Sequence, residues 1–151
     1  MTTLFIDADA CPVTRDAIAI ARAHRVPVVL VGNGSQHLAR FASRKGVETL
    51  EVASGRDSAD FAIVPLVAPE DIVVTGDIGL AAMVLGRGSR AFNHRGRQYF
   101  SATIDAELAV RHAEQRHRRA GGRTQGPSPF QHEDRERFCE TLERLLGACV
   151  A

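Results

Sequence analysis

Two aspartates close the first apolar run of the chain and are the residues best suited to chemistry. Asp7 and Asp9 follow Leu4-Phe5-Ile6, and Pro12 marks the start of the next element. Alternate residues of a strand point to opposite faces, but the chain curls where a strand ends, so both carboxylates can converge there. Close carboxylates repel each other and lose hydration, which favours a raised pKa or a bound cation. The pattern predicts a metal or phosphoryl-transfer site; in the alternative interpretation, Asp9 only caps a helix.

A third aspartate follows a later strand. Apolar runs that alternate with helical patterns predict a parallel sheet of order 3-2-1-4-5, in which strands one and four are neighbours. Asp77 follows the fourth strand, so Asp7, Asp9 and Asp77 are expected to meet in one crevice beyond the carboxyl ends of these strands. Asp60, and less strongly Asp57, lead the helix before strand four and could point into the same crevice; alternatively they only begin that helix.

The elements that position these residues are predicted from hydrophobic periodicity. We expect strands over 3–6, 26–31, 47–52 and 71–75, and helices over 12–24, 35–44, 57–67 and 78–85. Two short strands should follow around a tight turn at 93–96, then a helix over 102–120 capped by Ser101 or Thr103, a Gly/Pro-rich loop and a helix over 133–146. The prediction is a single domain over 1–151, with an α/β core (1–100) and C-terminal helices and a loop (101–151).

The composition argues against several classes of protein, among them membrane-spanning and secreted proteins. Of the 151 residues, 44% are hydrophobic and 25% are charged, as in ordinary globular proteins. No apolar run is long enough for a membrane span, and no secretory signal is visible, so we expect a cytoplasmic protein without a membrane partner. The three cysteines lack a metal-finger spacing. Cys11, at the start of a predicted helix, could have a lowered thiol pKa.

Positive charge is concentrated in the second half of the chain. Residues 87–123 hold nine arginines and three acidic residues, a net charge of +6. Arginine suits phosphate binding, and a basic segment facing an acidic site is what a nucleic-acid hydrolase requires. Asn93, Arg95 and Arg97, on the predicted turn, are candidate contacts to substrate phosphate. In the alternative interpretation, the basic segment is a solvated face and the turn is an ordinary polar hairpin.

An oxygen-rich site of this kind favours Mg²⁺ or Mn²⁺, one or two ions, over zinc. Such ions can activate a water and stabilise charge on a scissile phosphate.

Several motifs, spread over nearly the whole chain, are informative in combination: Asp7-Ala-Asp9-Ala-Cys11-Pro12-Val13, Ala59-Asp60, Thr75-Gly76-Asp77-Ile78, Leu80-Ala81-Ala82, Asn93-His94-Arg95-Gly96 with Tyr99, Gly126-Pro127, Pro129-Phe130, and Asp134-Arg135 with Phe138. Together they resemble the bacterial YaiI/YqxD family, an uncharacterised family that looks like a member of the PIN/NYN-like nuclease group. The resemblance implies a PIN-like three-layer α/β/α fold. It also implies that Asp7, Asp9, Asp60 and Asp77 are both the catalytic residues and the ligands of Mg²⁺ or Mn²⁺.

Three functions follow from these residues. The favoured function is that of a metal-dependent nuclease whose partner is nucleic acid, with RNA preferred because of the family resemblance. The chain could also form a homo-oligomer. The second is a nucleic-acid-binding or regulatory module that retains the acidic crevice without turnover. The third is a haloacid-dehalogenase-like phosphatase with an aspartyl nucleophile. The only lysine, Lys45, lies early in the chain, and no second acid pair follows Asp77, which speaks against the third.

Overall fold

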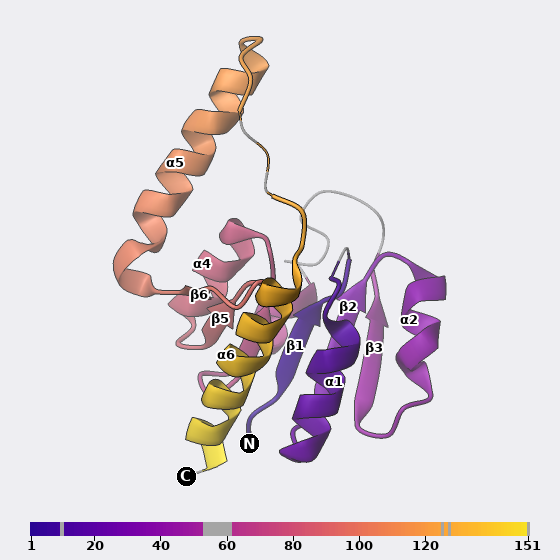
Figure 1. Cartoon of the computed structure of the whole chain (residues 1–151). Helices are drawn as coiled ribbons and strands as arrows, with labels where there is room; N and C mark the ends of the chain where they lie inside the picture. Colours follow the sequence, from indigo (N-terminus) through magenta and orange to yellow (C-terminus); the bar gives the residue numbers. More distant parts are fainter. Residues whose placement is uncertain (10, 53–61, 125, 127, 151) are drawn as a thin grey trace.

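The predicted alternation of strands and helices is present in the computed structural model of the chain, which describes residues 1–9, 11–52, 62–124, 126 and 128–150 (Figure 1). In chain order the elements are β1 (Leu4–Asp7), α1 (Thr14–Ala23), β2 (Val28–Gly32), α2 (Ser35–Ala42), β3 (Val47–Glu51), η1 (Val64–Leu66), β4 (Ile72–Val74), α4 (Ile78–Gly86), β5 (Arg90–Phe92), β6 (Gln98–Tyr99), α5 (Ser101–Arg119) and α6 (His132–Val150).

The strands form one sheet of order β3-β2-β1-β4-β5-β6, which confirms the predicted order of the first five. β1 lies between β2 and β4, and Leu4 pairs with Val28 on one side and with Ile72 on the other. These pairings are parallel, as are β2–β3 and β4–β5, whereas β6 returns antiparallel to β5. The carboxyl ends of β1 and β4 therefore lie side by side.

Helices cover both faces of the sheet, so the predicted three-layer α/β/α fold is confirmed. Leu4 and Ile6 belong to one buried cluster, together with Ile18 of α1 and Leu142 of α6. Phe5, between them, belongs to a second cluster with α4 and the start of α5. This division follows from the strand itself, because successive side chains point to opposite faces.

The last helix, α6, packs against the turn between β5 and β6. Phe138 stacks on Phe92 with 5.2 Å between ring centroids, and the Thr141 hydroxyl donates a hydrogen bond to the Gly96 carbonyl oxygen (2.7 Å). Gly96 has φ +86°, and a Cβ there would lie 2.5 Å from the Arg137 backbone. The turn thus needs glycine both for its backbone angle and for the close approach of α6.

Helix α5 leaves the body of the molecule and projects beyond it (Figure 1). Among its 19 residues, Ile104 is the buried one. The helix begins at Ser101 with Phe100 as its N-cap residue and has no side-chain cap, so the predicted caps, Ser101 and Thr103, are wrong. The Thr103 hydroxyl instead donates to the Phe100 carbonyl oxygen (3.5 Å).

Other predicted bounds differ slightly. The first helix begins at Thr14, two residues after Pro12. Residues 57–61 of the predicted helix 57–67 lie outside the described residues, and its end is the 3₁₀ turn η1. In the described part of the chain, no helix is both long and apolar enough to cross a membrane.

Candidate functional site

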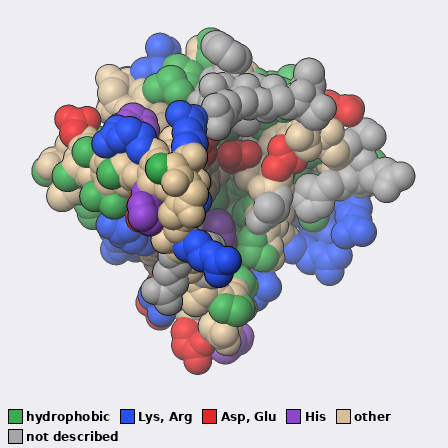
Figure 2. Space-filling view, turned by 90° about the horizontal axis from the view of Figure 1, so that it is seen from above, with side chains coloured by type: hydrophobic (Ala, Val, Ile, Leu, Met, Phe, Trp, Pro, Cys, Tyr) green, Lys and Arg blue, Asp and Glu red, His purple; other side chains and the backbone are tan. Residues whose placement is uncertain are grey.

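Three of the four predicted acidic residues line one cleft at the carboxyl ends of β1 and β4. Asp7 is the last residue of β1, Asp9 lies two residues further on, and Asp77 follows β4. The cleft has a volume of about 270 Å³ and is also lined by Cys11, Val74, Thr75, Gly76 and His94. Figure 2 looks onto the molecule from above: acidic side chains lie near the middle of this face, with basic side chains on both sides.

Asp7 carries the strongest electrostatic perturbation in the cleft. Its Oδ2 accepts a hydrogen bond from the Thr75 hydroxyl (3.0 Å). Burial raises the pKa of Asp7 to about 6; the bond from Thr75 opposes this shift, and the charges of Asp9 and Asp77 add to it. Keeping this carboxylate ionised therefore costs free energy, which a cation in the cleft would offset.

Asp9 is held against the end of β2. Its two carboxylate oxygens lie 3.1 and 3.2 Å from the backbone N–H of Asn33, which donates to them. A Cβ on Gly32 would lie 2.8 Å from Asp9 Oδ1, so the carboxylate occupies space that only glycine leaves open. The alternative role of Asp9 as a helix cap is wrong, because Val13 is the N-cap residue of α1.

Asp77 has a structural role besides its place in the cleft. It is the N-cap residue of α4, and its Oδ1 accepts from the backbone N–H groups of Gly79 (2.8 Å) and Leu80 (3.3 Å). Its own N–H donates to the Thr75 hydroxyl oxygen (3.0 Å). The buried Thr75 side chain therefore links Asp7 to Asp77 through its hydroxyl group. The Tyr99 hydroxyl supports this bridge from β6 by donating to the Thr75 carbonyl oxygen (3.2 Å).

The fourth predicted ligand, Asp60, lies outside the described residues, as does Asp57. Among the described residues, no three His, Cys, Asp or Glu side chains are gathered closely enough to hold a metal ion. The carboxylate oxygens that are present are nevertheless suitable ligands for a hard divalent cation. Within the described part, hydrogen bonds reach only Oδ2 of Asp7 and Oδ1 of Asp77, which leaves the other oxygen of each carboxylate available. Carboxylate oxygens are the ligands that Mg²⁺ and Mn²⁺ prefer.

An arginine-lined groove continues from the acidic cleft. This basic groove has a volume of about 490 Å³ and shares Gly76 and His94 with the cleft. Its further lining is Ile78, Asn93, Arg95, Arg97, Tyr99, Arg111, Glu114, Arg118, Thr124 and Gly126. The predicted substrate-contact residues Asn93, Arg95 and Arg97 therefore lie beside the acids, and α5 adds Arg111 and Arg118.

The turn residues also hold their own loop together. Asn93 Oδ1 accepts from the backbone N–H groups of Arg95 and Arg97, both at 3.0 Å. The Arg95 guanidinium donates to Asp134 Oδ2 (3.1 Å) and to Ser128. Arg97 forms an ion pair with Glu107 of α5 (2.5 Å). The turn is therefore an ordinary polar hairpin in its own contacts, and its residues line the basic groove as well.

Sequence reasoning missed Thr75 and His94 as parts of the site. A buried threonine at the end of an apolar strand, directly before Gly-Asp, is the signal that could have indicated the first. His94 connects the cleft to the groove, and burial, then the Arg95 charge, lowers its pKa, while Asp134 acts in the opposite direction. Burial raises the pKa of the Cys11 thiol, so the expectation of a lowered pKa at Cys11 is wrong.

Lys45 lies at the opposite end of the sheet from the acidic cleft. It lies just before β3, at the edge of the parallel sheet where strands begin, whereas the acids lie where β1 and β4 end. A lysine-assisted aspartyl-phosphate mechanism therefore lacks its lysine.

Comparison with known proteins gives the family. Residues 5–148 match the model of the family described as "Uncharacterized BCR, YaiI/YqxD family". UPF0178 proteins from Bacillus cereus (strain AH820) and Bacillus anthracis (strain A0248) are each 42% identical over 144 residues, which cover 95% of this chain and 98% of theirs. One from Bacillus thuringiensis subsp. konkukian (strain 97-27) is 42% identical over 143 residues, 95% of this chain and 97% of its own. No solved structure matched. The resemblance found in the sequence is thereby confirmed, and the chain belongs to the YaiI/YqxD family.

Proposed function

We propose that this protein is a metal-dependent nuclease that hydrolyses phosphodiester bonds in RNA. The observation that supports it best is the cleft that gathers Asp7, Asp9 and Asp77 and opens directly into an arginine-lined groove. An acidic centre beside a basic track suits a polyanion whose scissile phosphate must approach carboxylates.

Asp7, Asp9 and Asp77 would hold Mg²⁺ or Mn²⁺, with Asp60 as the further ligand that the family resemblance implies. The bound ion would activate a water and stabilise charge on the scissile phosphate. The chain's own contribution is orientation. Thr75 holds the Asp7 carboxylate, the Asn33 N–H holds that of Asp9, and the start of α4 holds that of Asp77. Arg118 would bind a flanking phosphate.

Metal binding is the first test. Mn²⁺ titration calorimetry on the wild type should give a binding isotherm that Asp9→Asn abolishes, with circular dichroism showing both proteins folded. Asp105→Asn, an exposed aspartate of α5 outside the cleft, is the matched control and should bind like the wild type. Binding that survives in Asp9→Asn would remove Asp9 from the proposed site.

Cleavage is the second test. A labelled unstructured RNA should be cut by the wild type with Mn²⁺ and not by Asp77→Asn, because asparagine retains the helix cap but loses the charge. Cleavage at the wild-type rate by this variant would exclude Asp77 from the mechanism.

One observation favours a second candidate, a nucleic-acid-binding module without turnover. Among the described residues, the acids do not close into a three-ligand metal site. For such a module we expect RNA binding that weakens steeply with salt, and no products at any Mn²⁺ concentration.

A further inference from the structure

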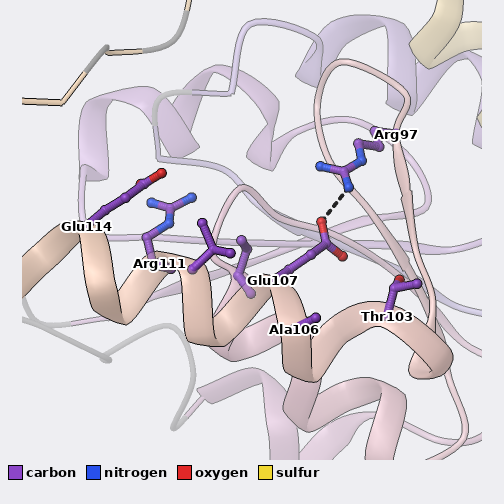
Figure 3. Close-up of a pocket in the computed structure, with 8 residues that line it drawn as sticks. Arg97, Thr103, Ala106, Glu107, Arg111 and Glu114 are labelled. Carbon is purple, nitrogen blue, oxygen red and sulfur yellow. Dashed lines mark ion pairs between the residues drawn. The ribbon is translucent and has the colours of Figure 1, made fainter.

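A second pocket lies beside the basic groove, between the start of α4 and the middle of α5 (Figure 3). Its volume is about 430 Å³, within the range of pockets that bind small ligands. Ile78 of α4 and Ala106 and Val110 of α5 give it an apolar lining. We name it the side pocket. Val110 is 59% exposed, so an apolar surface of α5 faces solvent there.

The side pocket is continuous with the groove that leads to the acids. Ile78, Arg97, Arg111 and Glu114 line both. Ile78 follows Asp77 directly, and neighbouring Cα atoms are about 3.8 Å apart. A strand that follows the basic groove from the acidic cleft would therefore pass the mouth of the side pocket.

The polar groups of the side pocket divide into a paired and an unpaired set. Glu107 is tied to Arg97, as the dashed line in Figure 3 marks. Arg111 and Glu114, three residues apart on the same side of α5, form no ion pair or hydrogen bond among the described residues. The pocket thus offers an apolar surface, one guanidinium and one carboxylate with no partner in the described part of the chain.

This combination fits an unstacked nucleobase. Bases splayed out of single-stranded RNA pack their flat faces on apolar or guanidinium surfaces and present their Watson–Crick edge to polar side chains. A carboxylate only accepts hydrogen bonds, so it selects an edge that donates. Guanine, with N1–H beside its 2-amino group, is the base with two adjacent donors on that edge.

We propose that the side pocket is a nucleobase subsite that favours guanine, with Glu114 accepting from N1–H and the 2-amino group and Arg111 covering the base. This inference rests on the proposed function for its ligand, because it takes RNA as the bound polymer. It goes beyond that function by assigning a base preference to residues that touch none of the acids.

The test measures binding without metal, so that it does not depend on cleavage. Fluorescence anisotropy in EDTA would compare labelled RNA hexamers of uridine that carry one guanosine, one inosine or one adenosine. Since the uridines let the strand slide, the single purine can reach the pocket. A good bidentate contact is worth about 1–3 kcal/mol, so guanosine should bind roughly 5- to 150-fold more tightly than adenosine. Inosine, which lacks the 2-amino donor, should lie between them.

Glu114→Gln should reduce the preference for guanosine over adenosine to less than about twofold, because the amide offers one acceptor instead of two. The ratio is the readout, since removal of one negative charge strengthens the binding of all three RNAs. Glu140→Gln, an exposed glutamate of α6, is the matched control and should keep the full preference. Circular dichroism would show that the exposed substitutions leave the fold intact.

The inference is overturned if the wild type binds the three hexamers equally or binds none of them, or if Glu114→Gln keeps the preference. Equal binding together with Mn²⁺-dependent cleavage would leave the nuclease proposal standing. A guanosine preference that Glu114→Gln removes, in a protein that cleaves no RNA, would support the subsite and refute the nuclease.

Discussion

Replacing Asp7 by asparagine should stabilise the metal-free protein at neutral pH. The folded-state pKa of Asp7 is about 6, against 3.8 for an ordinary aspartate. At 1.36 kcal/mol per pKa unit, the ionised carboxylate costs up to about 3 kcal/mol of folding free energy. Because the folded pKa is raised, the associated stability is complete below about pH 4 and is lost as the pH rises through 6. Asparagine cannot ionise, and its amide oxygen can still accept from Thr75, so the variant avoids this loss.

Urea unfolding between pH 4 and pH 8 in EDTA measures the effect. The gain in unfolding free energy for Asp7→Asn should be close to zero at pH 4 and approach about 3 kcal/mol at pH 8. Asp105→Asn, a matched change at an exposed site, should show no such pH-dependent gain. A gain for Asp7→Asn that is the same at both pH values, or a loss at pH 8, would refute the reasoning.

Three further variants address the framework around the site. Gly96→Ala should lower the unfolding free energy by more than about 2 kcal/mol in urea, because it combines φ +86° with a clash against the Arg137 backbone; Gly46→Ala, at φ +83° in open space, should lose only about 1–2 kcal/mol. Asp77→Ala should cost about 0.5–2 kcal/mol through the lost cap, whereas Asp77→Asn should retain most of it, and equal losses in urea would contradict the capping role. Phe138→Ala should cost about 3–5 kcal/mol, since this ring is fully buried against Phe92, while Phe100→Ala, at a ring that is 55% exposed, should change the thermal midpoint far less.

The sheet and the acidic cleft were largely predictable because both depend on local patterns. Apolar runs that end in aspartate indicate where strands stop, and the alternation with helices determines which of those ends become neighbours. Asp7, Asp9 and Asp77 lie in one cleft for that reason. The α5 caps were predicted wrongly, since Ser101 and Thr103 are common capping residues and the sequence does not reveal that Phe100 directs the chain into the helix.

The remaining parts of the site depend on contacts between distant segments. Thr75 matters because Asp7, 68 residues away, lies within hydrogen-bond distance of its hydroxyl. Gly32 matters because the Asp9 carboxylate occupies the space beside it. The neighbouring sequence can single out Thr75, which precedes Gly-Asp, but it does not show that Asp7 is its partner or that Asp9 lies against Gly32. The basic groove likewise depends on α5 lying beside the β5–β6 turn, to which the Arg97–Glu107 ion pair joins it, and the count of arginines alone does not reveal this arrangement.

The attachment of α6 also sets an order of assembly. Residues 132–150 are synthesised after strands β1 to β6 and after Asp7, Asp9 and Asp77. Until Asp134 has emerged, Arg95 lacks its carboxylate partner, and until Thr141 has emerged, the Gly96 carbonyl lacks the hydroxyl that anchors it. The groove wall beside the acids is therefore fixed last.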